Sequence, residues 1–204
     1  MKIFSANVQS LTELYNSELR KALDLEEQIV KALPIMMEKA TDTQLKQAFQ
    51  SHLQESETHV QKVTSLLSKQ PKSDSETCKV IHALVTEAQD TMKDVNDPDV
   101  LDVALIGAAQ QVEHHEIAVY GTLKSWAKQL GFAEAEKLLG ETLEEEKRAD
   151  QLLSEVAEQA ANASGGEGEI EEEDDEAEED KESRAELDGS ESDEKPKGKK
   201  SGKK

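Results

Sequence analysis

Apolar side chains recur at steps of three and four residues through about the first 160 positions, with polar side chains between them. This period is that of an amphipathic helix and differs from the alternation of a strand. It predicts four long helices, over about residues 8–39, 43–69, 98–130 and 133–161, and a short helix over about residues 80–92. The apolar stripe of the first helix is Leu11, Tyr15, Ala22, Leu25, Ile29, Leu33 and Met36. The stripe of the third long helix is Leu101, Leu105, Ala108, Val112, Val119, Leu123, Trp126 and Leu130.

Turn-forming and capping residues separate the predicted helices. The Thr-Asp-Thr segment at residues 41–43 stops the first helix and offers a side-chain cap for the second. Pro98 suits the first position of the third long helix, and Gly131 ends that helix. Pro34 lies inside the first helix, where we expect a kink or a weak point.

Four long helices with one long, partly helical connection in the middle predict an all-α fold of two antiparallel hairpins joined by a crossover. That arrangement is the ferritin-like four-helix bundle, here with a short extra helix in the crossover connection. The composition agrees with this fold class. Aromatic residues make up only 3% of the chain, and glycine and proline number 10 and 4, which is atypical of β-sandwiches and β-barrels.

The sequence also carries signals about the compartment. No apolar run approaches the roughly 20 residues of a membrane span, and the first residues lead into polar sequence without the apolar stretch of a signal peptide. Cys78 is the one cysteine, which excludes an internal disulfide and a cysteine-rich zinc site. A single thiol suits a reducing compartment. We therefore expect a cytoplasmic protein that does not bind membranes.

The last forty residues differ in composition from the rest. Residues 165–204 contain 17 acidic and 8 basic residues, a net charge of -9, and residues 1–164 carry the other -12 of the total of -21. This segment is acidic first, then basic, and has almost no large apolar side chains. We therefore expect a helical domain at residues 1–164 and a disordered tail at residues 165–204. The negative charge disfavours nucleic acid as a partner, while the tail could contact a protein partner.

Removing residues 165–204 is expected to leave the thermal stability of the helical domain almost unchanged, because the segment lacks the side chains that form a core. Thermal melts of the truncated and the full chain test this expectation. A fall in Tm of more than about 5 °C would show instead that the tail packs on the helices.

Several acidic and histidine side chains fall on the apolar stripes, whereas a solvated helix carries such groups on its opposite face. At about 100° per residue, Glu18 and Glu26 lie inside the stripe of the first helix, and Glu116 lies inside that of the third long helix. The others within or beside a stripe are His52, Glu55, Ser56, His59, Glu113, His115, Glu145 and Glu146. Because a buried carboxylate without a partner costs several kcal/mol, these groups need partners.

Depth along the helices decides which of these groups can meet. Four inward glutamates lie 14 or 15 residues from the turn of their own hairpin, at residue 41 or residue 131, and these are Glu26, Glu55, Glu116 and Glu146. At a rise of about 1.5 Å per residue, each lies about 22 Å from its turn. One helical turn away lie His59, Glu113 and Asp150. Glu18 lies about 12 Å further along its helix and cannot join them.

Carboxylates gathered in one apolar core repel one another unless protons or cations neutralise them. Two divalent ions bridged by glutamate are the usual solution in such bundles, and oxygen-rich ligation with a little imidazole suits iron or manganese better than zinc. The sequence therefore predicts a site for two divalent metal ions. Its candidate ligands are Glu26, Glu55, His59, Glu113, Glu116, Glu146 and Asp150, with His52 as an alternative.

Structural roles are the alternative for each of these residues. A single inward glutamate is more often the salt-bridge partner of a neighbour than a metal ligand, and a core histidine is as often hydrogen-bonded as ligating. The pattern does not distinguish Glu145 from Glu146, since both border the stripe of the last helix. Four glutamates at one depth are harder to explain by coincidence, which favours the metal site.

Four segments carry a further signal, and they are LDLEEQIVKALPIM (23–36), TDTQLKQAFQSHLQES (41–56), EHHEIAVYGTL (113–123) and TLEEEKRAD (142–150). In order and spacing they resemble the YciF/YciE family of bacterial ferritin-like stress proteins, over about residues 8–160. The resemblance implies a ferritin-like bundle, a homodimer, and a di-metal site related to that of rubrerythrins. The site residues that it implies are Glu26, Glu55, Glu113, Glu116, Glu145, Glu146 and Asp150.

Two functions are consistent with these residues and with the resemblance. In the first, the protein binds a di-iron or mixed iron–manganese pair and acts on peroxide, dioxygen or iron during stress. In the second, a helical dimer keeps the same residues as a buried hydrogen-bonded network and binds a protein partner without metal chemistry. Metal analysis of the purified protein separates the two.

Overall fold

The computed structural model describes residues 8–71 and 73–164. Within these residues the chain forms five α-helices, which are α1 (Leu11–Lys39), α2 (Thr43–Ser68), α3 (Lys79–Asp94), α4 (Pro98–Gln129) and α5 (Ala133–Ser164). Four long helices and a short helix in the connection confirm the expected all-α fold. The expected disordered tail at residues 165–204 lies outside the described residues. No helix in the described part of the chain is long and apolar enough to cross a membrane.

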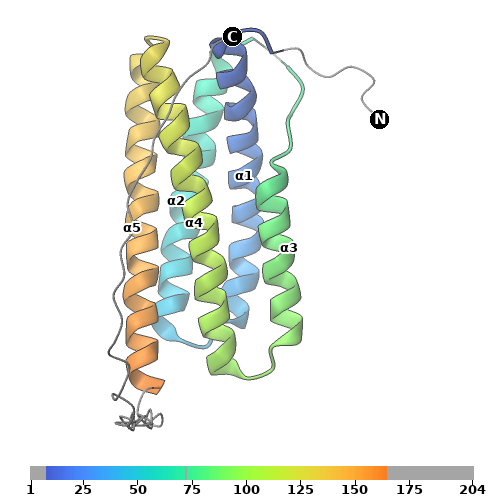
Figure 1. Cartoon of the computed structure of the whole chain (residues 1–204), viewed down its shortest axis with the longest axis vertical. Helices are drawn as coiled ribbons and strands as arrows, with labels where there is room; N and C mark the ends of the chain where they lie inside the picture. The colour runs from blue at the N-terminus through green and yellow to red at the C-terminus, as the bar shows by residue number, and fades with distance from the viewer. Residues whose placement is uncertain (1–7, 72, 165–204) are drawn as a thin grey trace, which may run out of the picture. The chain divides into compact units, whose positions relative to one another are not determined.

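The two helical hairpins are α1–α2 and α4–α5, and their turns lie at opposite ends of the bundle (Figure 1). Asp102, near the start of α4, binds the turn between α1 and α2. At the other end, Lys69 pairs with Glu134 at the start of α5. The segment between α2 and α4 therefore crosses the length of the bundle, and its helix α3 packs against α1 and α4. Each long helix runs antiparallel to the neighbours it packs against, as in ferritin-like bundles.

The residues that fix the ends of the helices are those expected from the sequence. The Asp42 carboxylate accepts a backbone hydrogen bond in the first turn of α2, and Asp97 caps α4 in front of Pro98. Gly131, with a φ of 73°, adopts the left-handed conformation that closes α4. Helix α1 continues through Pro34, which lies at an exposed position.

The core consists of two apolar layers with a polar layer between them. The layer toward the α1–α2 turn includes Leu33, Met36, Phe49, Leu105, Ile106 and Leu153. The layer toward the α4–α5 turn includes Tyr15, Leu19, Val63, Leu66, Leu123 and Leu139. Burial of these side chains is the main source of stability, and it also limits the access of water to the polar layer in the middle of the bundle.

The buried face of α4 is broader than the expected stripe. Its buried residues include Ile106, Ala109, Tyr120 and Ala127, whereas Ala108, Val112, Val119, Trp126 and Leu130 are half-buried. The difference arises because α4 packs against α1, α3 and α5, so that its apolar arc is wider than the stripe that faces one neighbour. Glu18, expected inside the stripe of α1, lies half-buried at its margin and pairs with Lys21 at 2.5 Å.

Asp102 joins α4 to the turn between α1 and α2, and its loss should destabilise the fold. Its buried carboxylate accepts hydrogen bonds from the backbone N–H groups of Thr41, at 2.8 Å, and Asp42, at 2.7 Å, and from Thr41 Oγ1, at 2.6 Å. Because Asp102→Ala removes all three, we expect the free energy of unfolding to fall by about 2–3 kcal/mol. Chemical denaturation measures the loss. The exposed Asp99→Ala is the control, and an equal loss in both variants would contradict this role for Asp102.

Candidate metal centre

Six buried side chains from all four long helices converge in the polar layer. They are Glu26 of α1, His52 and His59 of α2, Glu113 and Glu116 of α4, and Glu146 of α5, and none exposes more than 5% of its surface. Their common level follows from the helix lengths. The long helices have 26 to 32 residues, so a position about 15 residues from either turn lies near the middle of the bundle.

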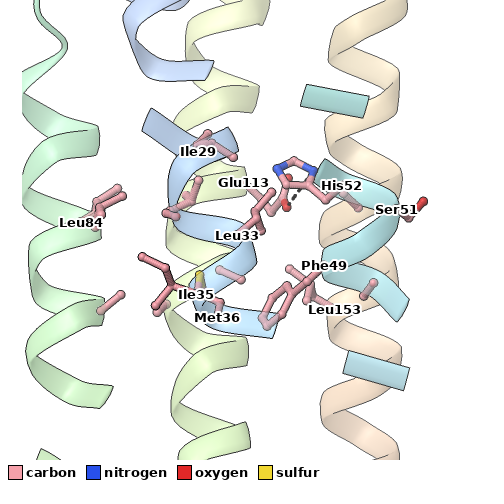
Figure 2. Close-up of a pocket in the computed structure, with 18 of the residues that line it drawn as sticks. Ile29, Leu33, Ile35, Met36, Phe49, Ser51, His52, Leu84, Glu113 and Leu153 are labelled. Atoms are coloured by element: carbon pink, nitrogen blue, oxygen red, sulfur yellow. Dashed lines mark ion pairs between the residues drawn. The ribbon is translucent and has the colours of Figure 1, made fainter. Parts of the chain in front are cut away.

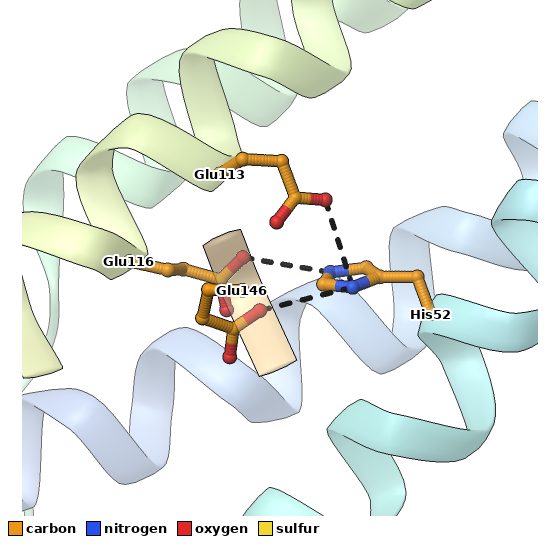
Figure 3. A group of neighbouring side chains, drawn as sticks. All are labelled: His52, Glu113, Glu116 and Glu146. Carbon is orange, nitrogen blue, oxygen red and sulfur yellow. Dashed lines mark ion pairs between the residues drawn. The ribbon is translucent and has the colours of Figure 1, made fainter. Parts of the chain in front are cut away.

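His52 lies at the centre of a first group of candidate ligands, together with Glu113, Glu116 and Glu146 (Figure 3). Its Nδ1 lies 3.6 Å from Glu113 Oε1 and 3.9 Å from Glu146 Oε2. Its Nε2 lies 3.5 Å from Glu116 Oε2. One donor atom of each residue lies within 4.8 Å of the others. Since an ion with ligands at about 2.1 Å spans about 4 Å between opposite donors, a small contraction closes the group around one cation.

Glu26, His59 and Glu146 form a second group. His59 Nδ1 lies 3.0 Å from Glu146 Oε1 and 3.4 Å from Glu26 Oε1. Glu146 belongs to both groups, because its Oε2 faces His52 and its Oε1 faces His59. A carboxylate placed between two sets of donors can bridge a pair of ions, as in other bundles with carboxylate-bound metal pairs.

Many polar atoms of these side chains lack a hydrogen-bond partner within residues 8–71 and 73–164. They are both oxygens of Glu116 and Glu146, both ring nitrogens of His52, Nδ1 of His59, and one oxygen each of Glu26 and Glu113. Buried polar atoms in proteins are nearly always hydrogen-bonded, because an unpaired one costs about 1–3 kcal/mol. Here, unpaired oxygen and nitrogen atoms from several helices face one another. This arrangement suits metal ligands around cations placed between them.

The carboxylates of the layer resist ionisation when no cation is bound. Burial, followed by repulsion from Glu146 and Glu26, raises the pKa of Glu116 well above its usual value. Burial is also the main cause of the raised pKa values of Glu113 and Glu146. A divalent ion has the opposite effect, because it favours the ionised form of its ligands. Protons and divalent cations would therefore compete for this layer.

His59 is drawn toward the charged form by the same carboxylates. Burial lowers its pKa, but the carboxylates of Glu146 and Glu26, at 3.0 and 3.4 Å from Nδ1, outweigh this effect and raise the pKa to about 11. In the absence of metal, an imidazolium between two glutamates therefore neutralises part of the charge of the layer.

Glu145 lies outside both groups and contacts the far side of the His59 ring. Its Oε2 lies 2.8 Å from His59 Nε2 and 2.6 Å from Lys62 Nζ. Burial raises the pKa of Glu145, but Lys62 and His59 outweigh this effect and lower it below its usual value. This contact turns Nδ1 of the ring toward the polar layer. The sequence left Glu145 and Glu146 undistinguished, whereas the structure places Glu146 between the two groups and Glu145 behind the imidazole.

Tyr120 is a member of the polar layer that sequence reasoning missed. Its hydroxyl donates a hydrogen bond to Glu26 Oε1, and its ring meets that of His59 edge-on, with 6.0 Å between the centroids. Burial, followed by the charge of Glu26, raises the pKa of Tyr120 well above its usual value, so the hydroxyl remains a donor. The signal in the sequence was its spacing of four residues from Glu116, which places both on one helical face.

Two of the predicted ligands lie outside both groups. Glu55 is only half-buried, and the inward positions of α2 at this level are taken by two histidines. Asp150 lies one turn beyond Glu146, where its Oδ2 faces the exposed His114 at 3.3 Å while its Oδ1 is buried without a partner in the described part of the chain. A ligand role for either residue stays a prediction.

Comparison with known proteins shows similarity over most of the chain. A family model described as a domain of unknown function, DUF892, matches residues 10–165. The YciF protein of Escherichia coli strain K12 is 35% identical over 153 residues, which cover 74% of this chain and 92% of YciF. A crystal structure of the E. coli stress protein YciF matches with a TM-score of 0.73 at 34% identity, over 76% of this chain and 99% of that one. The structure of YcfI from Rhodopseudomonas palustris, to which a structural role has been ascribed, matches with a TM-score of 0.71 at 38% identity, over 74% and 98% of the two chains.

Proposed function

The chain belongs to the DUF892 family and is similar to the YciF stress protein, and on this basis we propose that it binds two divalent metal ions, iron or manganese, and acts on peroxide, dioxygen or iron during stress. The observation that supports this proposal most is the position of Glu146 between two groups of buried donors. The charges of the site are consistent with the proposal. The four carboxylates of the two groups carry four negative charges when ionised, which equal the positive charge of two divalent ions.

The two groups define which residues would hold each ion. His52, Glu113, Glu116 and Glu146 would hold one, and Glu26, His59 and Glu146 the other. Oxygen donors outnumber nitrogen donors, which favours iron or manganese over zinc, and such ions supply redox and Lewis-acid chemistry when bound. The apolar layers on both sides limit the access of water to these residues. The chain also orients two of the ligands, His59 through Glu145 and Glu26 through Tyr120.

Glu145→Ala is expected to lower the affinity for Mn²⁺ by about 10- to 100-fold, because His59 loses the group that orients its ring. Isothermal titration calorimetry measures the affinity. Glu144→Ala, at the exposed neighbouring position, is the matched control and should leave it unchanged. Equal affinities in the two variants would contradict the orienting role of Glu145.

Anaerobic loading with ferrous iron, followed by mixing with hydrogen peroxide or dioxygen, tests the proposed activity. We expect the bound iron to be oxidised faster than the same concentration of free ferrous ion. The rate should fall by at least about tenfold in Glu116→Gln and remain unchanged in Glu27→Gln, which is exposed on α1. Oxidation no faster than that of the free ion would contradict the activity even if the metal binds.

A second function is favoured by contacts that neutralise part of the layer without metal, from Tyr120 to Glu26 and from His59 to Glu146. In this alternative the protein is a non-enzymatic helical homodimer that binds a protein partner under stress, for which the tail is a candidate surface. The structural role ascribed to YcfI is consistent with it. For both functions we propose a homodimer, from the family resemblance, in the cytoplasm, which suits a chain with one cysteine. Sedimentation of the full-length chain tests the dimer.

A further inference from the structure

A cavity of about 200 Å³ lies beside the polar layer, on the side toward the α1–α2 turn (Figure 2). All five helices contribute to its walls, which are mostly apolar and include Leu33, Met36, Phe49, Val85, Val112 and Leu153. Two further lining residues, Ile35 and Leu152, are 42% and 41% exposed. The cavity is therefore an internal space with access from solvent.

His52 and Glu113 form the polar end of this cavity. Both line it, and both belong to the first group of candidate ligands. Figure 2 shows the two side chains together at one edge of the space, with Phe49 and Met36 further from the polar layer. Both ring nitrogens of His52 and Oε2 of Glu113 are buried without a hydrogen-bond partner among the residues described. The end of the cavity toward the polar layer is therefore formed by side chains that have unused hydrogen-bonding capacity.

The walls restrict the chemistry of that molecule. An apolar cavity of about 150 Å³ in a protein core stays dry and binds a benzene-sized molecule, so this space is large enough for an aromatic ring or a short alkyl chain. An anion is disfavoured because the mostly apolar walls do not replace its hydration. The acidic side chains at the polar end, Glu113 with the neighbouring Glu116 and Glu146, offer it no positive charge. The charged residues Glu55 and Arg148 also line the cavity, with opposite signs and in less buried positions. A hydroxyl or a similar neutral group loses less hydration, and it can form a hydrogen bond with His52 or Glu113 once either side chain turns an unpaired atom toward the cavity.

We propose that this cavity binds a neutral, mainly apolar small molecule with one polar end group, held with that group toward His52 and Glu113. What the ligand does there rests on the proposed function, since a molecule so placed lies beside the first group of candidate metal ligands. Its binding requires only the cavity.

Calorimetric titration of the metal-free, full-length protein with 1-octanol tests the binding, and octanoate provides an anion of equal chain length. We expect saturable binding of about one octanol per chain and at least about tenfold weaker binding of octanoate. Absence of saturable octanol binding would overturn the proposal. Octanoate that binds as tightly as octanol would overturn it as well, because burial of a carboxylate in a mostly apolar space costs more than burial of a hydroxyl.

Substitutions on α3 test whether the cavity is the site. Ala88→Leu and Val85→Phe each place extra atoms in it, whereas Ala83→Leu adds atoms on the exposed face of the same helix. We expect each filling variant to weaken octanol binding by at least about tenfold and Ala83→Leu to leave it unchanged. Unchanged binding in the filling variants, with folding verified by circular dichroism, would overturn the proposal.

Nuclear Overhauser effects in the unsubstituted protein locate the ligand without any substitution. We expect contacts from octanol to the methyl groups of Val112 and Leu153, and contacts confined to methyl groups that do not line the cavity would overturn the proposal. Titration of the same samples with Mn²⁺ separates the two proposals. Octanol binding without metal binding refutes the proposed function alone, and metal binding without octanol binding refutes the cavity proposal alone.

Discussion

Glu116→Gln is expected to leave the metal-free protein as stable as the parent at pH 7, or up to about 2 kcal/mol more stable, while metal binding is largely lost. Glu116 is fully buried, its two oxygens have no hydrogen-bond partner among the described residues, and its pKa is raised, first by burial and then by Glu146 and Glu26. The amide keeps the shape of the side chain and removes a carboxyl group whose ionisation is unfavourable in this layer. The substitution also removes a candidate ligand. Loss of a residue that only orients a ligand lowers metal affinity by about 10- to 100-fold, and we expect a larger fall in the affinity for Fe²⁺ or Mn²⁺ here.

Thermal melts of the parent, Glu116→Gln and Glu27→Gln test this expectation, each with chelator and with Mn²⁺. Glu27 neighbours a candidate ligand in sequence but is exposed, so Glu27→Gln should behave as the parent. A structural salt bridge at Glu116 predicts the opposite sign, because the substitution would strand a buried cation and destabilise the metal-free protein by about 1–3 kcal/mol. Such a loss of stability in Glu116→Gln, together with a parent Tm that does not respond to metal, would refute the metal site.

The metal-free protein is expected to lose stability as the pH rises from about 6 to 9, by at least about 5 °C in Tm. The pKa of His59 is raised to about 11 by Glu146 and Glu26 against the effect of burial. Its contribution is therefore complete below the unfolded pKa of about 6.5 and is lost as the pH rises toward 11. The pKa values of Glu113, Glu116 and Glu146 are also raised, mainly by burial, so their ionisation costs stability in the same direction.

The metal-loaded protein should show the opposite slope below neutral pH, because protons compete with the ions for the same ligands and metal binding releases them. Melts in chelator and in Mn²⁺ at about pH 5, 6, 7, 8 and 9 measure both slopes. His82→Gln, which changes an exposed imidazole on α3, should not alter either slope, whereas Glu116→Gln should flatten that of the metal-free protein. A metal-free Tm that rises from pH 6 to 9 would contradict the charge distribution described for the polar layer.

Most of the fold could be predicted because its determinants are local. The period of the apolar residues locates the helices, and Asp42, Pro98 and Gly131 mark their ends by backbone chemistry that does not depend on distant contacts. Three of the four glutamates expected to point inward from angle and depth, Glu26, Glu116 and Glu146, lie buried in the polar layer, whereas Glu55 is half-buried and lies outside both groups. The three share one level although the two turns lie at opposite ends, because about 15 residues is half the length of either arm.

The rest of the candidate site depends on packing between distant segments. The helical angle places Glu55 at the edge of α2 and His52 in the centre, but angle alone does not show which side chain reaches Glu113 and Glu116. The contact of Lys62 with Glu145 joins residues 83 positions apart, and no local pattern announces it. The cavity likewise depends on how α3 packs against α1 and α4, which the short apolar pattern of that helix leaves open.

The number of metal ions bound per chain tests the central proposal most directly. The full-length protein, purified without added metal, is loaded anaerobically with ferrous iron or Mn²⁺, desalted and analysed for metal against protein concentration. The two groups that share Glu146 predict about two ions per chain, and a clear loss of metal in Glu116→Gln but not in Glu27→Gln. Fewer than about 0.2 ions per chain, of either metal, would contradict the metal centre and favour the dimer that works without metal.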